Sequence, residues 1–318
     1  MPTQSEMGKS FEYAVLKAIY EQLAEEQPVS KIDNTSLDVA RGFYDGIGDD
    51  LRAVLDAAAV AAIRHIVRLE PQLVTPAGNT PLYLSLQEDA AGQRGDVRDV
   101  LIRRQQNAWE IGISCKHNHS AVKHSRLSKH IDFGQEWLGV PCSQGYFDAI
   151  SPIFDRLAEK RREGALWSSM QYKATDVYIP VLTAFSNELE RIATECPDAP
   201  ASLIRYLLGR NDFYKAISHD SNRTTTIQAF NLDGTLNKNA GAARPLARVS
   251  PLSLPTRIVD VSFKEESTNT IIVTCNHGWS INMRIHSASS RVEASLKFDV
   301  KLEGMPPELY TAYELWGV

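Results

Sequence analysis

The pattern of hydrophobic and polar positions predicts long helices in the first half of the chain. Residues 8–26 carry apolar side chains at helical spacing with charged residues between them, and Pro28 ends the segment. A second helix is predicted from Asp49 to Leu69, because this alanine-rich segment begins with acidic residues and is closed by Pro71.

Three later stretches also have the pattern of helices. Ser151 and Pro152 have the character of an N-cap and a first helical position, which predicts a helix that runs to about Met170. Two more helices are predicted over Pro180–Thr194 and Ala201–Ile217.

A pair of strands lies between these two groups of helices. Residues 95–102 and 109–116 are separated by a polar turn at 103–107, which predicts a hairpin. Leucine at every second position from Leu82 to Leu86 predicts a strand that precedes it.

The last hundred residues have the pattern of β structure. Residues 231–236 have a hairpin signal, and strands are predicted at 270–274, 279–286 and 292–302. We therefore expect an α/β protein. A mixed central sheet flanked by helices would occupy residues 1–218, and a β-rich region residues 219–318, either as two domains or as one integrated domain.

Composition narrows the class of protein. With 318 residues, of which 43% are hydrophobic, the chain can bury a sizeable core. No stretch approaches the ~20 apolar residues that span a bilayer, and the first ten residues do not have the pattern of a signal peptide. The four cysteines show no close pairing for a metal or a disulfide. A cytoplasmic protein with free thiols is expected.

Positive charge is concentrated in one segment, although the net charge of −5 argues against a partner as acidic as DNA. From Ile111 to Ile131 there is no acidic residue, so a local cationic surface is expected. Such a segment suits contacts with DNA phosphates, with a solvated polar loop as the alternative. The candidate DNA-binding residues here are His117, Asn118, His119, Lys123, His124, Arg126 and Lys129.

The predicted hairpin carries the candidate chemistry. Ser114 and Lys116 share one face of the second strand because side chains alternate, and Asp99 can face them from the first strand. The pattern Asp99-(x14)-Ser114-x-Lys116 resembles the acid, linker and (D/E)-x-K hairpin of the PD-(D/E)XK nucleases, with Ser114 in place of the second acid. It indicates a nuclease core in which a divalent metal activates a water. Asp96 is the alternative to Asp99, which is preferred because it directly precedes the apolar strand.

The serine leaves one metal ligand displaced or missing. Glu110 does not replace it, because six strand residues put it roughly 20 Å from Lys116. The remaining candidate acids are Glu12, Glu136 and Asp132. The backbone carbonyl of Cys115 is a further candidate ligand beside Asp99.

Two longer segments carry a more specific resemblance. Residues 109–127 (Trp-Glu-Ile-Gly-Ile-Ser-Cys-Lys-His-Asn-His-Ser-Ala-Val-Lys-His-Ser-Arg-Leu) and residues 282–299 are similar to the HaeIII family of type II restriction enzymes, and the similarity extends to Gly8–Glu12. The resemblance implies Mg²⁺-dependent cleavage of double-stranded DNA within GGCC, with blunt ends and 5′-phosphates. It also implies a cognate GGCC cytosine methyltransferase as functional partner. A glutamate on the first helix is frequent in this nuclease class, which favours Glu12.

A target of G·C pairs presents guanine O6 and N7 acceptors that arginine or lysine can contact. The C-terminal candidates for DNA contacts are Asn282, Arg284, His286, Arg291 and Lys297, with ordinary charged residues of a solvent-exposed sheet face as the alternative. A palindromic target suits a two-fold homodimer, although a monomer that nicks each strand in turn also suits it.

Two other functions remain open at this point. A repair or methylation-dependent nuclease of the same class would share the site chemistry and differ in its target. A DNA-binding protein without catalysis is favoured by Ser114 in place of the usual acid.

Overall fold

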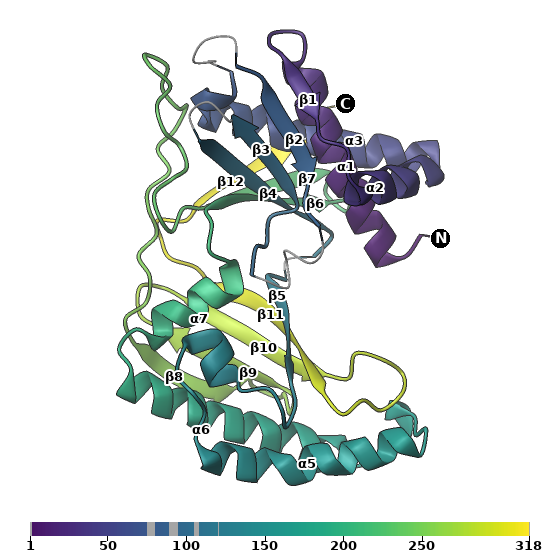
Figure 1. Cartoon of the computed structure of the whole chain (residues 1–318), viewed down its shortest axis with the longest axis vertical. Coiled ribbons are helices and arrows are strands. Elements are labelled where there is room, and N and C mark those ends of the chain that lie inside the picture. The colour runs from purple at the N-terminus through teal and green to yellow at the C-terminus, as the bar shows by residue number, and fades with distance from the viewer. Residues whose placement is uncertain (1, 75–79, 89–94, 105–107, 120, 318) are drawn as a thin grey trace. The chain divides into compact units, whose positions relative to one another are not determined.

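The computed structural model describes residues 2–74, 80–88, 95–104, 108–119 and 121–317 (Figure 1). Its contacts divide the chain into two compact units. Unit 1 combines Met1–Ser120, Arg210–Leu252 and Glu308–Val318, and unit 2 combines Ala121–Gly209 and Ser253–Pro307. Each unit therefore joins segments that are distant in sequence.

A seven-stranded mixed sheet forms the centre of unit 1, in the order β1-β2-β3-β4-β6-β7-β12. The bounds of these strands are Val29–Lys31, Leu82–Leu86, Val100–Arg104, Trp109–His117, Phe213–His219, Thr224–Phe230 and Tyr310–Leu315. β3 and β4 pair antiparallel, which confirms the predicted hairpin, although residues 105–107 of its turn lie outside the described residues. β6 runs parallel to β4, with Ser114 opposite Lys215.

Three long helices belong to unit 1: α1 (Gln4–Leu23), α2 (Thr35–Gly46) and α3 (Asp49–Leu69), and the short 3-10 turn η1 (Pro71–Leu73) follows them. α3 has the predicted bounds. α1 begins four residues before the predicted start, because Thr3 and Glu6 form a capping box in which each side chain accepts a hydrogen bond from the other residue's amide.

The core of unit 1 fixes which strand residues face away from the helices. Apolar residues of α1, α2 and α3 pack with every second residue of β4 and β6, namely Ile111, Ile113, Cys115, Tyr214 and Ala216. The intervening residues Ser114, Lys116 and Lys215 therefore project from the other face of the sheet.

Unit 2 contains a five-stranded antiparallel sheet in the order β5-β11-β10-β9-β8. These strands span Lys123–Leu127, Leu296–Gly304, Ser280–His286, Thr270–Cys275 and Ile258–Phe263. Its helical elements are η3 (Gly134–Leu138), α5 (Gln144–Arg162), η4 (Trp167–Ser169), η5 (Ala174–Tyr178), α6 (Ile179–Glu195) and α7 (Ala199–Leu208). The rings of Phe298 on β11 and Phe185 on α6 lie 5.2 Å apart, so α6 covers one face of this sheet.

The helix predicted from Ser151 to Met170 was placed wrongly. α5 begins at Gln144, where Ser143 is the N-cap and accepts a hydrogen bond from the Tyr146 amide, and it ends at Arg162. Pro152 lies inside this helix, and the Ser151 hydroxyl donates back to the carbonyl of Phe147 at 2.6 Å instead of capping a terminus.

The helix predicted over Ala201–Ile217 is also wrong in its second half. α7 ends at Leu208, and Gly209 follows with a φ of 91°, a conformation that favours glycine. The apolar residues from Phe213 onward then form the buried strand β6, which a continuous apolar run does not distinguish from a helix.

The hairpin predicted at residues 231–236 is not formed. The carboxylate of Asp212 accepts hydrogen bonds from the amides of Leu232, Asp233 and Thr235, and it holds this segment as a loop. The predicted strands at 270–274 and 279–286 are confirmed as β9 and β10, and the last predicted strand begins four residues late, at Leu296.

The expected α/β class is confirmed, with a mixed sheet flanked by helices and a separate antiparallel sheet. Within the described part of the chain, no helix is long and apolar enough to cross a membrane. The four cysteines are free thiols, as expected.

Candidate active site

Asp99 lies where β3 begins, and the sheet fixes its backbone. Its amide donates to the carbonyl of Ile113 at 2.9 Å, and its carbonyl accepts from the amide of Gln87 at 2.9 Å. The residue is therefore held between β2 and β4, next to Ser114.

The carboxylate of Asp99 is the centre of a polar cluster. Its Oδ2 accepts hydrogen bonds from the Cys115 amide at 2.6 Å, the Ser114 hydroxyl at 3.3 Å and the Lys116 ammonium at 3.4 Å. Among the described residues, no hydrogen bond to Oδ1 is found. The structure thus brings together Asp99, Ser114 and Lys116 as the sequence pattern predicted, and it leaves one carboxylate oxygen for a ligand.

Glu12, on α1, belongs to the same cluster. It is only 8% exposed, and the ammonium of Lys9 donates to it at 3.0 Å. Burial and, next, the charge of Asp99 raise the pKa of Glu12 to about 7. The negative charge of Asp99 therefore acts on Glu12.

Lys116 keeps its proton in this environment. Burial disfavours its charged form, but the nearby groups Asp99, Cys115 and Glu12 outweigh that effect and raise the pKa of Lys116 above its usual value. The cluster therefore combines two acids with a charged ammonium.

Lys215 is a residue of this region that the sequence did not reveal, because it fell within a predicted helix. It lies on β6 opposite Ser114 and is 3% exposed. Burial and, next, the positive charge of Lys116 lower the pKa of Lys215 to about 7, while Asp99 opposes the shift. A single lysine in the run Phe213-Tyr-Lys-Ala-Ile217 is the signal that could have identified it.

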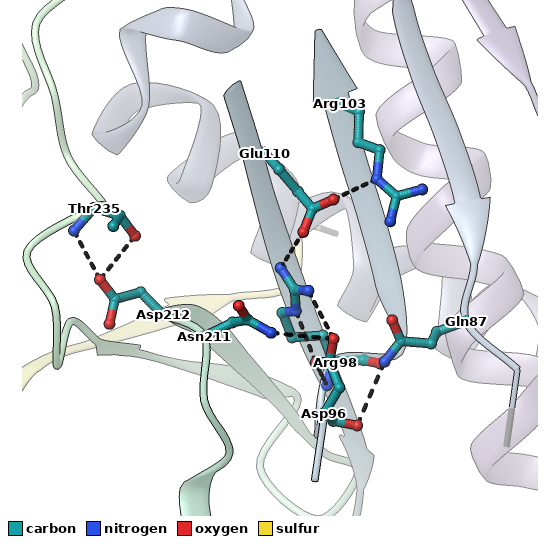
Figure 2. A network of polar contacts seen from close by, with 8 residues as sticks. All are labelled: Gln87, Asp96, Arg98, Arg103, Glu110, Asn211, Asp212 and Thr235. Atoms are coloured by element: carbon teal, nitrogen blue, oxygen red, sulfur yellow. Dashed lines mark hydrogen bonds and ion pairs between the residues drawn. The ribbon is translucent and has the colours of Figure 1, made fainter. Parts of the chain in front are cut away.

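Asp96, the alternative to Asp99, is engaged elsewhere (Figure 2). Arg98 donates to its two oxygens at 2.8 and 2.7 Å and also donates to Glu110 at 2.6 Å. Asn211 donates to Asp96 at 3.3 Å, and Arg103 pairs with the other oxygen of Glu110. Asp96 and Glu110 therefore form a clamp around Arg98, directly before Asp99 in the chain.

The donor set fits Mg²⁺. Among the described residues, no three His, Cys, Asp or Glu side chains converge as a metal-ligand group. Mg²⁺ commonly takes one or two carboxylates and completes its shell with waters and phosphate oxygens, whereas a structural zinc site needs four protein ligands. Asp99 and Glu12, with the free Oδ1, match the first case.

The other two candidate acids lie in unit 2. Asp132 accepts hydrogen bonds from the amides of Gln135 and Cys142, so it fixes the chain around the π-helical turn η3. Glu136 is an exposed residue of that turn.

The basic segment is divided between the two units. In unit 1, His117 is buried and contacts the hydroxyl of Ser218 at 3.0 Å, and burial lowers its pKa. Asn118 adopts a φ of 55° and donates to Asp220 at 2.9 Å. These two side chains hold the turn between β6 and β7, and His119 beside them is half-buried.

In unit 2 the basic residues of the same segment make their own contacts. Lys123 donates to the carbonyl of Tyr206 at 2.9 Å, and Lys129 pairs with Asp155 at 2.5 Å. Arg126 is exposed and donates to Glu293 at 2.7 Å. His124 lies on β5, where its backbone pairs with Asp299.

The C-terminal candidates gather on one face of the unit 2 sheet. On this face, Arg126 pairs in register with Lys297, and Lys297 pairs with His286. Arg284 is exposed and lies 3.5 Å from Asp299, while Asn282 donates to Glu303 at 2.7 Å. The open pocket of about 440 Å³ on the same face is lined by Lys264, Glu265, Ser267, Asn269, Thr270, Asn282, Arg284, Asp299 and Lys301.

Arg291 is the one C-terminal candidate outside a long strand. It is exposed and forms an isolated bridge with Leu166. Together with the preceding residues, Arg291 adds an exposed cation to unit 2, whose sheet face opposite α6 is polar.

The chain resembles characterised proteins over nearly its whole length. The family model of the HaeIII restriction endonuclease matches residues 8–306. The chain is 39% identical over 310 residues to the type II restriction enzyme HaeIII of Haemophilus aegyptius, which covers 97% of each protein. No solved structure gives a significant match.

Proposed function

Because the chain belongs to the HaeIII restriction endonuclease family, we propose that it cleaves both DNA strands within GGCC, with Mg²⁺ as cofactor, and leaves blunt ends with 5′-phosphates. As a member of that family it is a type II restriction enzyme, a site-specific deoxyribonuclease. The target and the cofactor are those implied by the resemblance.

The contact between Asp99 and Lys116 is the observation that carries the proposal. An acid at the start of one strand lies 3.4 Å from a lysine on the next, in the hairpin that the PD-(D/E)XK pattern requires. The Cys115 amide fixes the acid in this place at 2.6 Å. The topology of unit 1 supports a core of that class.

Asp99, Glu12 and the backbone carbonyl of Cys115 would hold the metal. When bound, Mg²⁺ lowers the pKa of a water and offsets negative charge on the phosphate. Lys116 acts as a charged group, because its neighbours raise its pKa. It therefore orients the attacking water and stabilises the phosphate rather than removing a proton.

Recognition is assigned to unit 2. The polar sheet face presents Asn282, Arg284, His286 and Lys297, and an arginine can donate two hydrogen bonds to guanine O6 and N7 in the major groove. The side chain of Arg284 is 52% exposed, and its ion pair with Asp299 is long, at 3.5 Å. Arg284 would therefore leave Asp299 at little cost and bind a base instead. Arg126, Lys129 and Arg291 would contact phosphates, which set register without reading sequence.

Two partners follow from the proposed target. A palindromic site suits a homodimer with one active site for each strand. A GGCC cytosine methyltransferase would protect the host genome from cleavage.

The test is digestion of unmethylated plasmid DNA by the purified protein, with Mg²⁺ or with EDTA, followed by sequencing of the fragment ends. Mg²⁺-dependent fragments that end at GG/CC are expected for the wild type and for Lys160→Ala, a matched control on the exposed surface of α5. Lys116→Ala should leave the plasmid intact. Intact plasmid with the wild type, folded and bound to DNA, would contradict the proposal and favour a non-catalytic DNA-binding protein.

A further inference from the structure

Lys215 is a buried lysine that the proposed mechanism does not use. It lies in the middle of β6 and is 3% exposed, and the residues two before and two after it, Phe213 and Ile217, are apolar and buried. A charged group in such a place reduces stability unless its surroundings compensate for the lost hydration. An apolar residue at this position would give a more stable folded protein.

Lys215 stands in a polar row that crosses three strands. It pairs in register with Ser114 on β4 and with Gln228 on β7, and all three residues are buried. Directly paired residues of neighbouring strands project from the same face. The row reaches Asp99, because the Ser114 hydroxyl lies 3.3 Å from its carboxylate.

The charges of the candidate site act on Lys215. Lys116 disfavours its protonated form and Asp99 favours it. Electrostatic interaction is mutual, so the charge of Lys215 acts in turn on Asp99 and on any phosphate bound there. Lys215 is thus part of the site in electrostatic terms as well as by its position.

The serine at position 114 gives this lysine its significance. An acid there, as in the usual pattern, would stand between Asp99 and Lys215 and would pair with the lysine. With Ser114, no carboxylate lies at that position, and the Asp99 carboxylate acts on Lys215 across the serine.

We propose that Lys215 is a second lysine of the cleavage site, which offsets the negative charge that develops on the phosphate. The inference rests on the proposed nuclease function. A preorganised group of this kind is typically worth about 10²–10³ in rate.

The first experiment compares Lys215→Met with the wild type and with Lys17→Met, a lysine of unit 1 that pairs with Asp56 away from the site. Single-turnover cleavage of a GGCC duplex in Mg²⁺, binding of the same duplex in Ca²⁺, and urea unfolding are measured for each. Lys215→Met should cleave about 100-fold more slowly, bind DNA within about threefold of the wild type, and unfold at an equal or higher urea concentration. Lys17→Met should cleave normally. Lys215→Arg, which keeps the charge, should recover part of the rate.

The outcome separates three accounts. Cleavage by Lys215→Met at the wild-type rate would overturn the inference and leave the proposed function intact. Loss of DNA binding and of stability in the same proportion as cleavage would show a structural lysine, and would also overturn it. A wild type inert toward every duplex would instead overturn the proposed function, and with it this role.

A second measurement does not depend on cleavage. Ser114→Asp introduces a carboxylate beside Lys215. The factor by which it lowers the folding equilibrium constant should be at least about tenfold larger in the Lys215→Met background than in the wild type, because Lys215 is then not there to pair with the new carboxylate. Equal costs in the two backgrounds would contradict the geometry on which the proposal stands.

Discussion

The side chain of Arg98 lies directly across Gly112, where a Cβ atom would come within 2.2 Å of the arginine Cδ. This close approach allows Arg98 to reach Glu110 beyond the glycine while it also holds Asp96 (Figure 2). Because Asp99 follows Arg98 in the chain, the clamp positions the backbone on which the candidate metal ligand stands.

Gly112→Ala is therefore expected to displace Arg98 and to misplace Asp99. We expect a loss of about 1–3 kcal/mol in the free energy of unfolding, as for other overpacked sites, and a loss of cleavage of at least about tenfold. Urea unfolding and single-turnover cleavage measure the two effects.

The matched control is Gly42→Ala, a glycine inside α2 whose added Cβ would meet nothing within 4 Å. It should raise stability by about 0.5–1 kcal/mol and leave cleavage unchanged. An alanine at position 112 that behaves like the one at position 42 would rule out the clamp.

Base reading by Arg284 predicts an effect that depends on sequence. Arg284→Ala should weaken binding to a GGCC duplex by about 1–3 kcal/mol and should hardly change binding to unrelated DNA. Lys297→Ala should weaken both and reduce the slope of log K against log salt by about 1. Fluorescence anisotropy in Ca²⁺ at several salt concentrations measures these quantities.

Arg41→Ala serves as the control for that series, since Arg41 is exposed on α2 and pairs with Asp38 one turn away. If Arg284→Ala lowers the affinity for the GGCC duplex and for unrelated DNA equally, Arg284 contacts a phosphate rather than a base.

Glu70 predicts a dependence of stability on pH. It is fully buried, and burial raises its pKa to about 7 from 4.5, although the amide of Asn237 and the hydroxyl of Tyr214 donate to it. The unfolded chain therefore loses this proton first, and the contribution of Glu70 to stability falls as the pH rises from about 4.5 to 7. Glu70→Gln should stabilise the protein by about 2 kcal/mol at pH 8 and have little effect near pH 4.5.

Urea unfolding of Glu70→Gln and of the exposed control Glu159→Gln across this pH range makes the comparison. A gain at pH 8 no larger than that of the control would show that burial does not raise the pKa of Glu70.

Local signals determined what the sequence predicted well. The acidic start and the closing proline predicted α3, and alternation with the turn predicted the β3–β4 hairpin. The Asp99, Ser114 and Lys116 cluster followed from that hairpin, because facing strands bring alternate residues together.

The features that the sequence did not predict depend on long-range contacts. β4 pairs with β6, where Ser114 meets Lys215, and β5 pairs with β11. Both pairings join residues far apart in sequence, so a short window contains no signal for the discontinuous units. Phe213–Ile217 was read as a helix because a buried apolar strand lacks alternation. Lys215 was therefore missed, and the Asp212 carboxylate that binds the 231–236 loop was missed for a similar reason.

The choice between Asp99 and Asp96 is the most direct test of the central claim that cleavage takes place at the Asp99–Lys116 cluster. The measurement is the single-turnover rate of GGCC duplex cleavage in saturating Mg²⁺ for Asp99→Asn and Asp96→Asn, with DNA binding in Ca²⁺ to show that both variants are folded. We expect Asp99→Asn to lose about 10³-fold or more, because a ligand of the metal is removed, and Asp96→Asn to keep measurable cleavage with lower stability. Full activity in Asp99→Asn together with its loss in Asp96→Asn would contradict the account and move the active site to the Arg98 clamp.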